Sequence, residues 1–103
     1  MGYIYFIYDK SNIKIGYTKD ISQRRKTLQT SNPNKLIILG YICGEKSKEK
    51  ELHKIFKEYK TLNEWFYPAQ ELIDYINKNN EMVVFIGWID NQLKVYKKMK
   101  IMN

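Results

Sequence analysis

Residues 3–18, YIYFIYDKSNIKIGYT, decide the fold of this chain. Aromatic and β-branched residues fill positions 3–8, and positions 9–12 have the composition of a turn. Residues 13–17 form a second short strand in this pattern, so the stretch predicts a β-hairpin. Gly16 lies inside the second strand, which indicates a bulge or the close approach of another group.

The segments that follow alternate between helical and strand-like patterns. Thr18 or Asp20 can cap a helix that runs to about residue 30. Residues 36–43 form a continuous apolar run of strand length. Two further helices are expected, one over about 48–59 and one that starts at Pro68 and stops within 77–80. This order predicts an α+β fold with helices packed on a small sheet.

A second hairpin is expected at the C-terminus, where residues 82–89 and 93–101 flank an Asp-Asn-Gln turn. Lys94, Lys98 and Lys100 fall on one face of its last strand. That face could follow a phosphate backbone, or it could be a solvated edge strand that lysines protect from aggregation. We therefore divide the chain into a main domain, 1–79, and a C-terminal β-hairpin extension of the same domain, 80–103.

Length and composition exclude several classes of protein. A chain of 103 residues has room for one core, and no apolar run approaches the ~20 residues that span a bilayer. The single cysteine, Cys43, excludes an internal disulfide and a multi-cysteine zinc site. It predicts a reducing setting, cytoplasmic or nuclear, or a viral factory if the chain is viral. The sequence has no Walker loop and no GxGxxG motif.

The charge balance is strongly basic, with 18 Lys and Arg against 11 Asp and Glu, a net charge of +7. Such a balance indicates either a polyanionic partner or simple solubility in a lysine-rich chain. Phosphodiester hydrolysis needs a base that activates water, a cation that neutralises phosphate charge and a carboxylate that holds a divalent metal. The predicted elements carry candidates for each of these tasks: Tyr5, Lys14, Arg24, Arg25, Glu49, Glu51 and His53.

Helical geometry separates the two acids but not the two arginines. Arg24 and Arg25 are placed almost symmetrically about the apolar face of the first helix. Glu49 and Glu51 point about 160° apart and flank opposite edges of the apolar stripe of the second helix. That predicted stripe consists of Leu52, Ile55, Phe56 and Tyr59.

Tyr3-Ile4-Tyr5 followed by Lys14-Ile15-Gly16-Tyr17-Thr18 resembles the paired motifs of the GIY-YIG nuclease superfamily. Arg24 lies eight residues after Gly16, at the offset where that superfamily places its arginine. Glu49-x-x-Leu52-His53-x-x-Phe56, then Glu64-Trp65-Phe66, resembles one branch in particular. This branch is the T5 ORF172 / meiotically up-regulated gene 113 group, often described as DNA-binding, and the resemblance covers about residues 2–77.

The resemblance implies a small antiparallel three-stranded sheet flanked by helices, and DNA cleavage that depends on Mg²⁺ or Mn²⁺. It favours Arg24 over Arg25 as the catalytic arginine and Glu49 over Glu51 as the metal ligand. His53 lies one turn after Glu49 on the same side of the helix. Three roles in the site stay open for it: to support a catalytic residue, to carry a proton or to contact phosphate. Tyr5 matches the tyrosine of the first motif.

Some positions depart from the family pattern or match it poorly. Lys14 stands where many members have a second tyrosine, so either Tyr5 or Lys14 could take the proton from water. Asn63 is the nearest candidate for a late asparagine, but its position matches poorly. Tyr17 and Arg25 are expected to contact nucleic acid beside the catalytic residues. Trp65 and Phe66 are expected to anchor the core. Glu64 is expected to cap or hold a loop, with a role in the site as the less favoured interpretation.

Two function classes follow from the sequence. The first is a metal-dependent DNA endonuclease of low intrinsic sequence specificity, because a domain of this size has little surface for base readout. A homodimer or a larger protein partner would then supply specificity. The second is a non-catalytic nucleic-acid-binding module, and an interaction protein with incidental basic charge remains a third interpretation. No membrane partner is expected.

Overall fold

The structure is a computed structural model that describes residues 2–81, so the predicted C-terminal hairpin with Lys94, Lys98 and Lys100 lies outside the described residues. The opening hairpin is confirmed. Strand β1 (Gly2–Tyr8) pairs antiparallel with β2 (Ile13–Thr18), and Tyr5 stands opposite Gly16. The Asp9 carboxylate accepts hydrogen bonds from the backbone N–H groups of the next turn residues, at 2.9 and 2.7 Å, and this closes the turn.

In the described part of the chain the sheet has five strands rather than the three that were expected. Strand β3 (Ile37–Gly44) pairs with the other edge of β1, while β5 (Trp65–Phe66) pairs with β2 and β4 (Lys60–Leu62) pairs with β5. The order is β3-β1-β2-β5-β4, and every pair is antiparallel. Strands of two and three residues are too short to show an alternation of apolar and polar residues. The sequence therefore did not predict β4 and β5.

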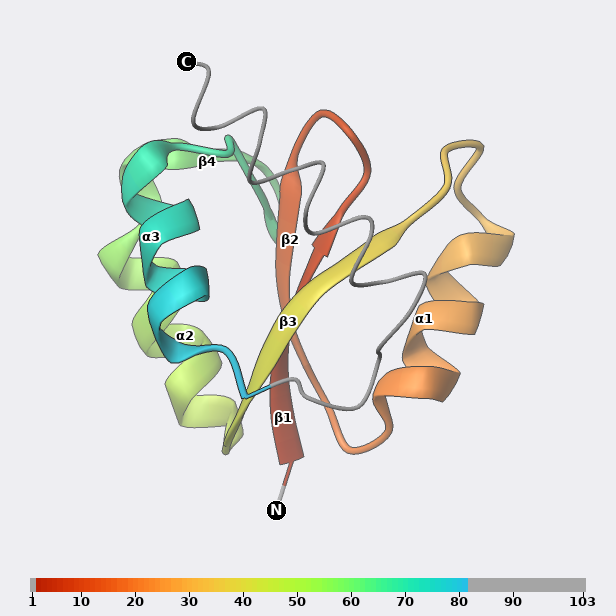
Figure 1. Cartoon of the computed structure of the whole chain (residues 1–103), viewed down its shortest axis with the longest axis horizontal. Coiled ribbons are helices and arrows are strands. Elements are labelled where there is room, and N and C mark those ends of the chain that lie inside the picture. Colours follow the sequence, from red (N-terminus) through yellow and green to blue (C-terminus); the bar gives the residue numbers. More distant parts are fainter. Residues whose placement is uncertain (1, 82–103) are drawn as a thin grey trace.

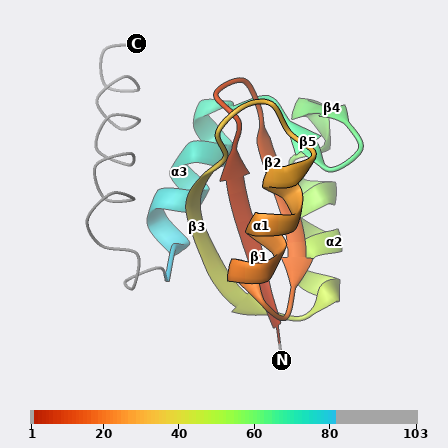
Figure 2. The ribbon, with the colours of Figure 1, turned by 90° about the vertical axis from the view of Figure 1, so that its right-hand side faces the viewer.

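Within residues 2–81, three α-helices cover the two faces of the sheet (Figures 1 and 2). Helix α1 (Ile21–Thr30) covers one face, and α2 (Lys46–Ile55) and α3 (Gln70–Asn79) cover the other. Asp20, one of the two predicted caps, accepts from the backbone N–H of Gln23 and so starts α1. None of these helices in residues 2–81 has both the length and the apolar character needed to cross a membrane.

The second and third helices differ from their predicted bounds. Helix α2 starts two residues early and ends at Ile55, after which Lys57–Tyr59 form a short 3₁₀-helix, η1. Ile55, placed in the predicted buried stripe, is 52% exposed. It lies about 100° around the helix from Phe56, and the core takes only the side that carries Leu52 and Phe56. Helix α3 begins at Gln70, so Pro68 precedes it.

The sheet separates two apolar clusters. The larger, on the side of α2 and α3, includes Ile4, Phe6, Ile13, Ile15, Leu52, Phe56, Phe66, Leu72 and Ile76. The smaller, on the side of α1, consists of Tyr5, Ile7, Ile21, Leu36 and Ile38. Trp65 packs against the smaller cluster and Phe66 lies in the larger, so both are core anchors as predicted. Tyr5 and its neighbours on β1 therefore alternate between the two faces, as strand residues do.

The outer edge of β3 is covered by the two residues that follow α3. The Asn80 side chain accepts from the Tyr41 N–H at 3.2 Å and donates to the Leu39 carbonyl at 3.4 Å. The Glu81 N–H donates to the Tyr41 carbonyl at 2.8 Å, and its carboxylate accepts from the Cys43 N–H at 2.8 Å. A Cβ at Gly40 would lie 2.4 Å from the Asn80 amide oxygen, so the glycine leaves room for this arrangement.

Candidate active site

Tyr5 is buried at the centre of the opening hairpin, and its hydroxyl lies over Gly16. The residue is 1% exposed. A Cβ at Gly16 would lie 2.3 Å from the Tyr5 hydroxyl oxygen and from its ring carbon Cζ. The hairpin shows no shift in register, so Gly16 marks the close approach of another group and not a bulge. The glycine of the second motif, Gly16, therefore leaves the space that the tyrosine of the first motif, Tyr5, occupies.

Replacing Gly16 by alanine should displace the Tyr5 ring. We expect Gly16→Ala to lower the free energy of unfolding by about 1–3 kcal/mol, as overpacking of a buried site does, and to break the contacts of the Tyr5 hydroxyl. Urea denaturation measures this change. Gly44→Ala is the matched control, since its nearest contact would be Ile4 Cδ1 at 3.0 Å, the end of a flexible side chain. Equal stability of the two variants would contradict the packing argument.

Arg24 reaches Tyr5 from helix α1, on the same side of the sheet. Its Nε–H donates to the Tyr5 hydroxyl oxygen at 3.3 Å. Burial raises the pKa of Tyr5 above its ordinary value of 10.0, and the hydrogen bond and charge of Arg24 oppose that rise. Arg25, which helical geometry could not distinguish from Arg24, is half-buried next to it on α1. The arginine that the spacing from Gly16 selected is therefore the one that touches Tyr5.

Lys14 forms an ion pair with Glu64, for which the sequence favoured a role in a loop over a role in the site. The Lys14 Nζ lies 3.0 Å from a Glu64 carboxylate oxygen and 5.5 Å from the centre of the Trp65 ring. Lys14 is only 8% exposed, although it carries a charge. A buried ammonium needs such a partner, so the ion pair explains how a lysine is accommodated inside this strand.

The short hairpin of β4 and β5 is what carries Glu64 to Lys14. Asn63 has a φ of 54°, in the left-handed region that asparagine tolerates in turns. The Glu64 carbonyl then accepts from the Ile15 N–H at 3.0 Å, and Trp65 stands opposite Lys14 in the ladder. This geometry gives Asn63 a turn role. A site role for Glu64 was the less favoured interpretation of the sequence, because Lys14 lies 50 positions away and the strands that bring the two residues together are too short to predict.

Glu49 lies on helix α2 and is 4% exposed, whereas the Glu51 side chain is 57% exposed and pairs with Lys48 at the surface. The Glu49 Oε1 atom lies 3.5 Å from the Lys46 Nζ. A carboxylate in the first turn of a helix is favoured by the helix dipole, but that preference does not require burial. Of the two acids, the one selected by its spacing from Leu52 is thus the buried one.

His53 fastens α2 to the edge of β2. Its Nε2 atom lies 2.8 Å from the Ile15 carbonyl oxygen. A carbonyl only accepts, so Nε2 carries the proton in this contact. The imidazole also packs edge-on against Phe66, with ring centres 4.9 Å apart. These contacts hold α2 against the sheet at a point one turn after Glu49. They therefore also position the buried Glu49 carboxylate.

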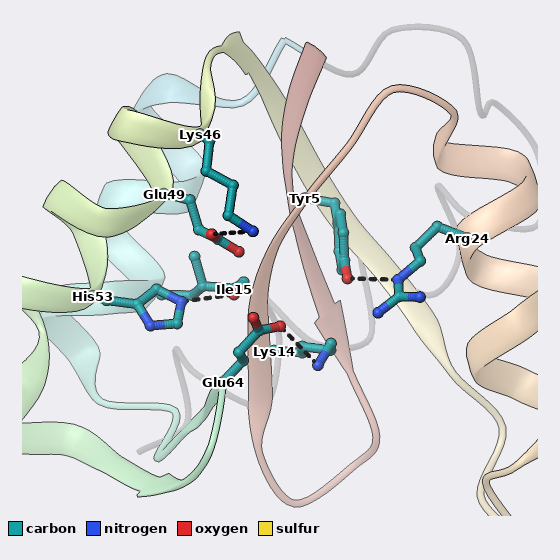
Figure 3. A network of polar contacts seen from close by, with 8 residues as sticks. All are labelled: Tyr5, Lys14, Ile15, Arg24, Lys46, Glu49, His53 and Glu64. Atoms are coloured by element: carbon teal, nitrogen blue, oxygen red, sulfur yellow. Dashed lines mark hydrogen bonds and ion pairs between the residues drawn. The ribbon is translucent and has the colours of Figure 1, made fainter.

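The predicted site residues form two groups that face each other across β2 (Figure 3). Tyr5, Arg24 and Lys14 lie on the α1 side, and Glu49 and His53 lie on α2. Strand β2 pairs with β5 only at Ile13 and Lys14, which leaves its later residues between the two groups. The charges of Glu64 and Glu49 both raise the pKa of Tyr5, after the larger effect of burial, so the groups share one electrostatic environment.

Tyr17, predicted to contact nucleic acid, lies at the end of β2 nearest Lys46. It is half-buried, its ring packs over Gly2, and the Lys46 Nζ lies 5.9 Å from the ring centre. Lys46 itself was not singled out by the sequence analysis. Tyr17 and Lys46 therefore extend the site along the edge of β2, on the side of α2.

The donor set suits a hard divalent cation that keeps most of its own waters. Among residues 2–81 there is no group of three His, Cys, Asp or Glu side chains that could hold a metal ion. Mg²⁺ is commonly bound by one or two carboxylates together with substrate phosphates, and Glu49 offers one buried carboxylate facing the site. Glu49 alone could therefore hold such a cation only together with further ligands, such as water and a substrate phosphate.

The described residues form a small α+β domain with a cluster of charged and aromatic side chains at the edge of its sheet. The chain belongs to the T5orf172 domain family, whose sequence pattern matches residues 2–90. That match includes every strand and helix described above. No curated protein and no solved structure matches the chain.

Proposed function

We propose that this protein is a divalent-metal-dependent DNA endonuclease of the GIY-YIG type. The observation that carries the proposal is the position of the Tyr5–Arg24 pair opposite the buried Glu49 carboxylate, across the edge of β2. A base, a cation and a metal-binding acid are the three groups that phosphodiester hydrolysis needs. The net charge of +7 supports a polyanionic substrate such as DNA.

In this proposal Arg24 and Lys14 bind the scissile phosphate. In the free protein Arg24 is hydrogen-bonded to the hydroxyl of the buried Tyr5. A phosphate that draws the guanidinium toward itself frees this hydroxyl, and the attacking water can then lie beside Tyr5. The Lys14–Glu64 ion pair contains a protonated lysine, which can contact phosphate but cannot accept a proton. The pairing of Lys14 with Glu64 supports Tyr5 as the group that takes the proton.

The hydrolysis then balances as follows. The water oxygen forms a new bond to phosphorus, and one of its protons passes to the Tyr5 phenolate. The bond from phosphorus to the leaving oxygen of the DNA chain breaks, and that oxygen keeps the electron pair and takes a proton from solvent. Tyr5 then returns its proton to solvent. Glu49 would hold Mg²⁺ or Mn²⁺, and the positive charge of the ion would offset the phosphate charge. It would also oppose the rise in the pKa of Tyr5 that burial and, to a smaller extent, the charge of Glu49 cause. Arg24 stabilises the charge that develops on the phosphate oxygens.

Conversion of supercoiled plasmid to open circles tests the proposal. We expect nicking with Mg²⁺ or Mn²⁺ and none with EDTA, and we expect little preference among sequences because the domain is small. A homodimer or a larger protein partner would add specificity. Absence of nicking at any divalent-metal concentration, by a protein that binds the plasmid, would overturn the catalytic assignment.

A second candidate, a non-catalytic nucleic-acid-binding module, is favoured by one specific observation. Glu49 is already neutralised by Lys46, and Lys14 by Glu64, so the acids of the site are occupied without a metal. Binding that weakens steeply as salt rises, without metal-dependent cleavage, would support this candidate. A lack of affinity for DNA or RNA at low salt would instead support an interaction protein with incidental basic charge.

A further inference from the structure

Lys46 and Glu49 form an unequal ion pair on helix α2. The two residues are three positions apart, and the Lys46 Nζ lies 3.5 Å from the Glu49 Oε1 atom. The lysine side chain is 61% exposed and the carboxylate side chain 6%. A solvated, flexible cation therefore neutralises a buried anion, and only the lysine can leave without being desolvated further.

The Tyr17 ring gives the Lys46 ammonium a second contact, in addition to Glu49. Its ring centre lies 5.9 Å from the Lys46 Nζ, within the range of a cation–π interaction. Tyr17 is fixed in turn by packing over Gly2. The ammonium is thus directed toward the edge of β2 and keeps an attractive partner there when it leaves Glu49.

A buried carboxylate is costly to leave unpaired, so it holds whichever cation is available. An ammonium and a divalent cation placed at one carboxylate also repel each other. From this geometry we propose that Lys46 is an internal counter-ion, which occupies Glu49 in the free protein and which a divalent cation displaces. The inference rests on the proposed function, because it assumes that Glu49 is the site of the metal.

The same helix contains a pair that lacks these properties. Lys48 and Glu51 have the same spacing, with Nζ and Oε1 3.7 Å apart, but the Glu51 side chain is 57% exposed. Water already stabilises that carboxylate, so removing Lys48 changes little at Glu51. Lys48→Gln is therefore a matched control for Lys46→Gln, with the same change in net charge two residues away.

Binding of Mn²⁺ in excess dimethyl phosphate, which supplies the phosphate ligand without a DNA duplex, tests the proposal without reference to cleavage. The paramagnetic resonance signal of the free ion measures this binding. At low ionic strength we expect Lys46→Gln to lower the Kd for Mn²⁺ about fivefold, the effect of removing one exposed ion pair. Lys48→Gln should leave the Kd unchanged. The gain should shrink at high salt, and it should be absent from the double variant Lys46→Gln/Glu49→Gln.

The outcomes separate the inference from the proposed function. Glu49-dependent binding of equal strength in the wild type and in Lys46→Gln overturns the inference alone, as does an equal gain in Lys48→Gln. Binding that persists unchanged in Glu49→Gln shows that the metal does not bind at Glu49, and this overturns the metal site and the counter-ion together. Absence of binding by Lys46→Gln has the same meaning. Because Lys46 is exposed, circular dichroism should show that this variant keeps its fold.

Discussion

Glu49→Gln should abolish metal-dependent nicking, with a rate lower by on the order of 10³-fold, since a bound cation supplies several kcal/mol of transition-state stabilisation. The substitution removes the charge of the one buried carboxylate at the site and keeps nearly the same volume. Plasmid nicking in saturating Mg²⁺ measures the effect. DNA binding without metal should stay the same or tighten, because one negative charge is lost.

Glu51→Gln is the control for this experiment. It changes the same charge on the same helix, at a residue whose side chain is 57% exposed and whose partner is Lys48. We expect its nicking rate to match that of the wild type. Full activity of Glu49→Gln, or an equal loss in both variants, would remove Glu49 from the metal site.

Tyr5→Phe should lower the rate of cleavage about 10²- to 10⁴-fold, the usual contribution of a general base. The phenyl ring still fills the space over Gly16, but the acceptor for Arg24 is lost. Burial holds the pKa of Tyr5 above 10.0, so the phenolate is the minority form at neutral pH and the wild-type rate should rise with pH. Rates of nicking between pH 7 and 10, with saturating metal, measure both effects.

The pH profile distinguishes Tyr5 from Lys14 as the base. If Tyr5→Phe lowers the rate but keeps the rise with pH, another group takes the proton and the assignment to Tyr5 is wrong. Tyr3→Phe is the matched control, since Tyr3 lies two residues earlier on β1 and packs against the same apolar cluster. It should keep both the wild-type rate and the wild-type profile.

The opening hairpin and the choice between neighbouring residues were predictable from sequence. The hairpin follows from local patterning and turn chemistry, which act over a few residues. Periodicity could not choose between Arg24 and Arg25, and the structure shows why spacing could: the eight-residue offset from Gly16 sets Arg24 at the Tyr5 hydroxyl, which itself lies over Gly16. The choice of Glu49 is likewise consistent with its burial.

The ion pair of Glu64 with Lys14 and the position of Lys46 at the site could not be predicted, for two different reasons. Glu64 reaches Lys14 through a tertiary pairing of very short strands, and nothing local in the sequence signals such pairing. Lys46 lies in a helix that starts two residues earlier than the sequence pattern indicated. The three-residue spacing that brings Lys46 next to Glu49 therefore could not be recognised as a helical contact. The roles of both residues depend on which side chains become buried, and burial is a property of the whole fold.

The covering of β3 by Asn80 and Glu81 has a consequence for how the chain can be shortened. A fragment that ends at Asn79 keeps all three helices and all five strands, yet it loses the partners of Leu39, Tyr41 and Cys43. Bare amide and carbonyl groups along an outer strand recruit strands from neighbouring molecules. Such a fragment should self-associate in size-exclusion chromatography, whereas one that ends at Glu81 should elute as the smaller species.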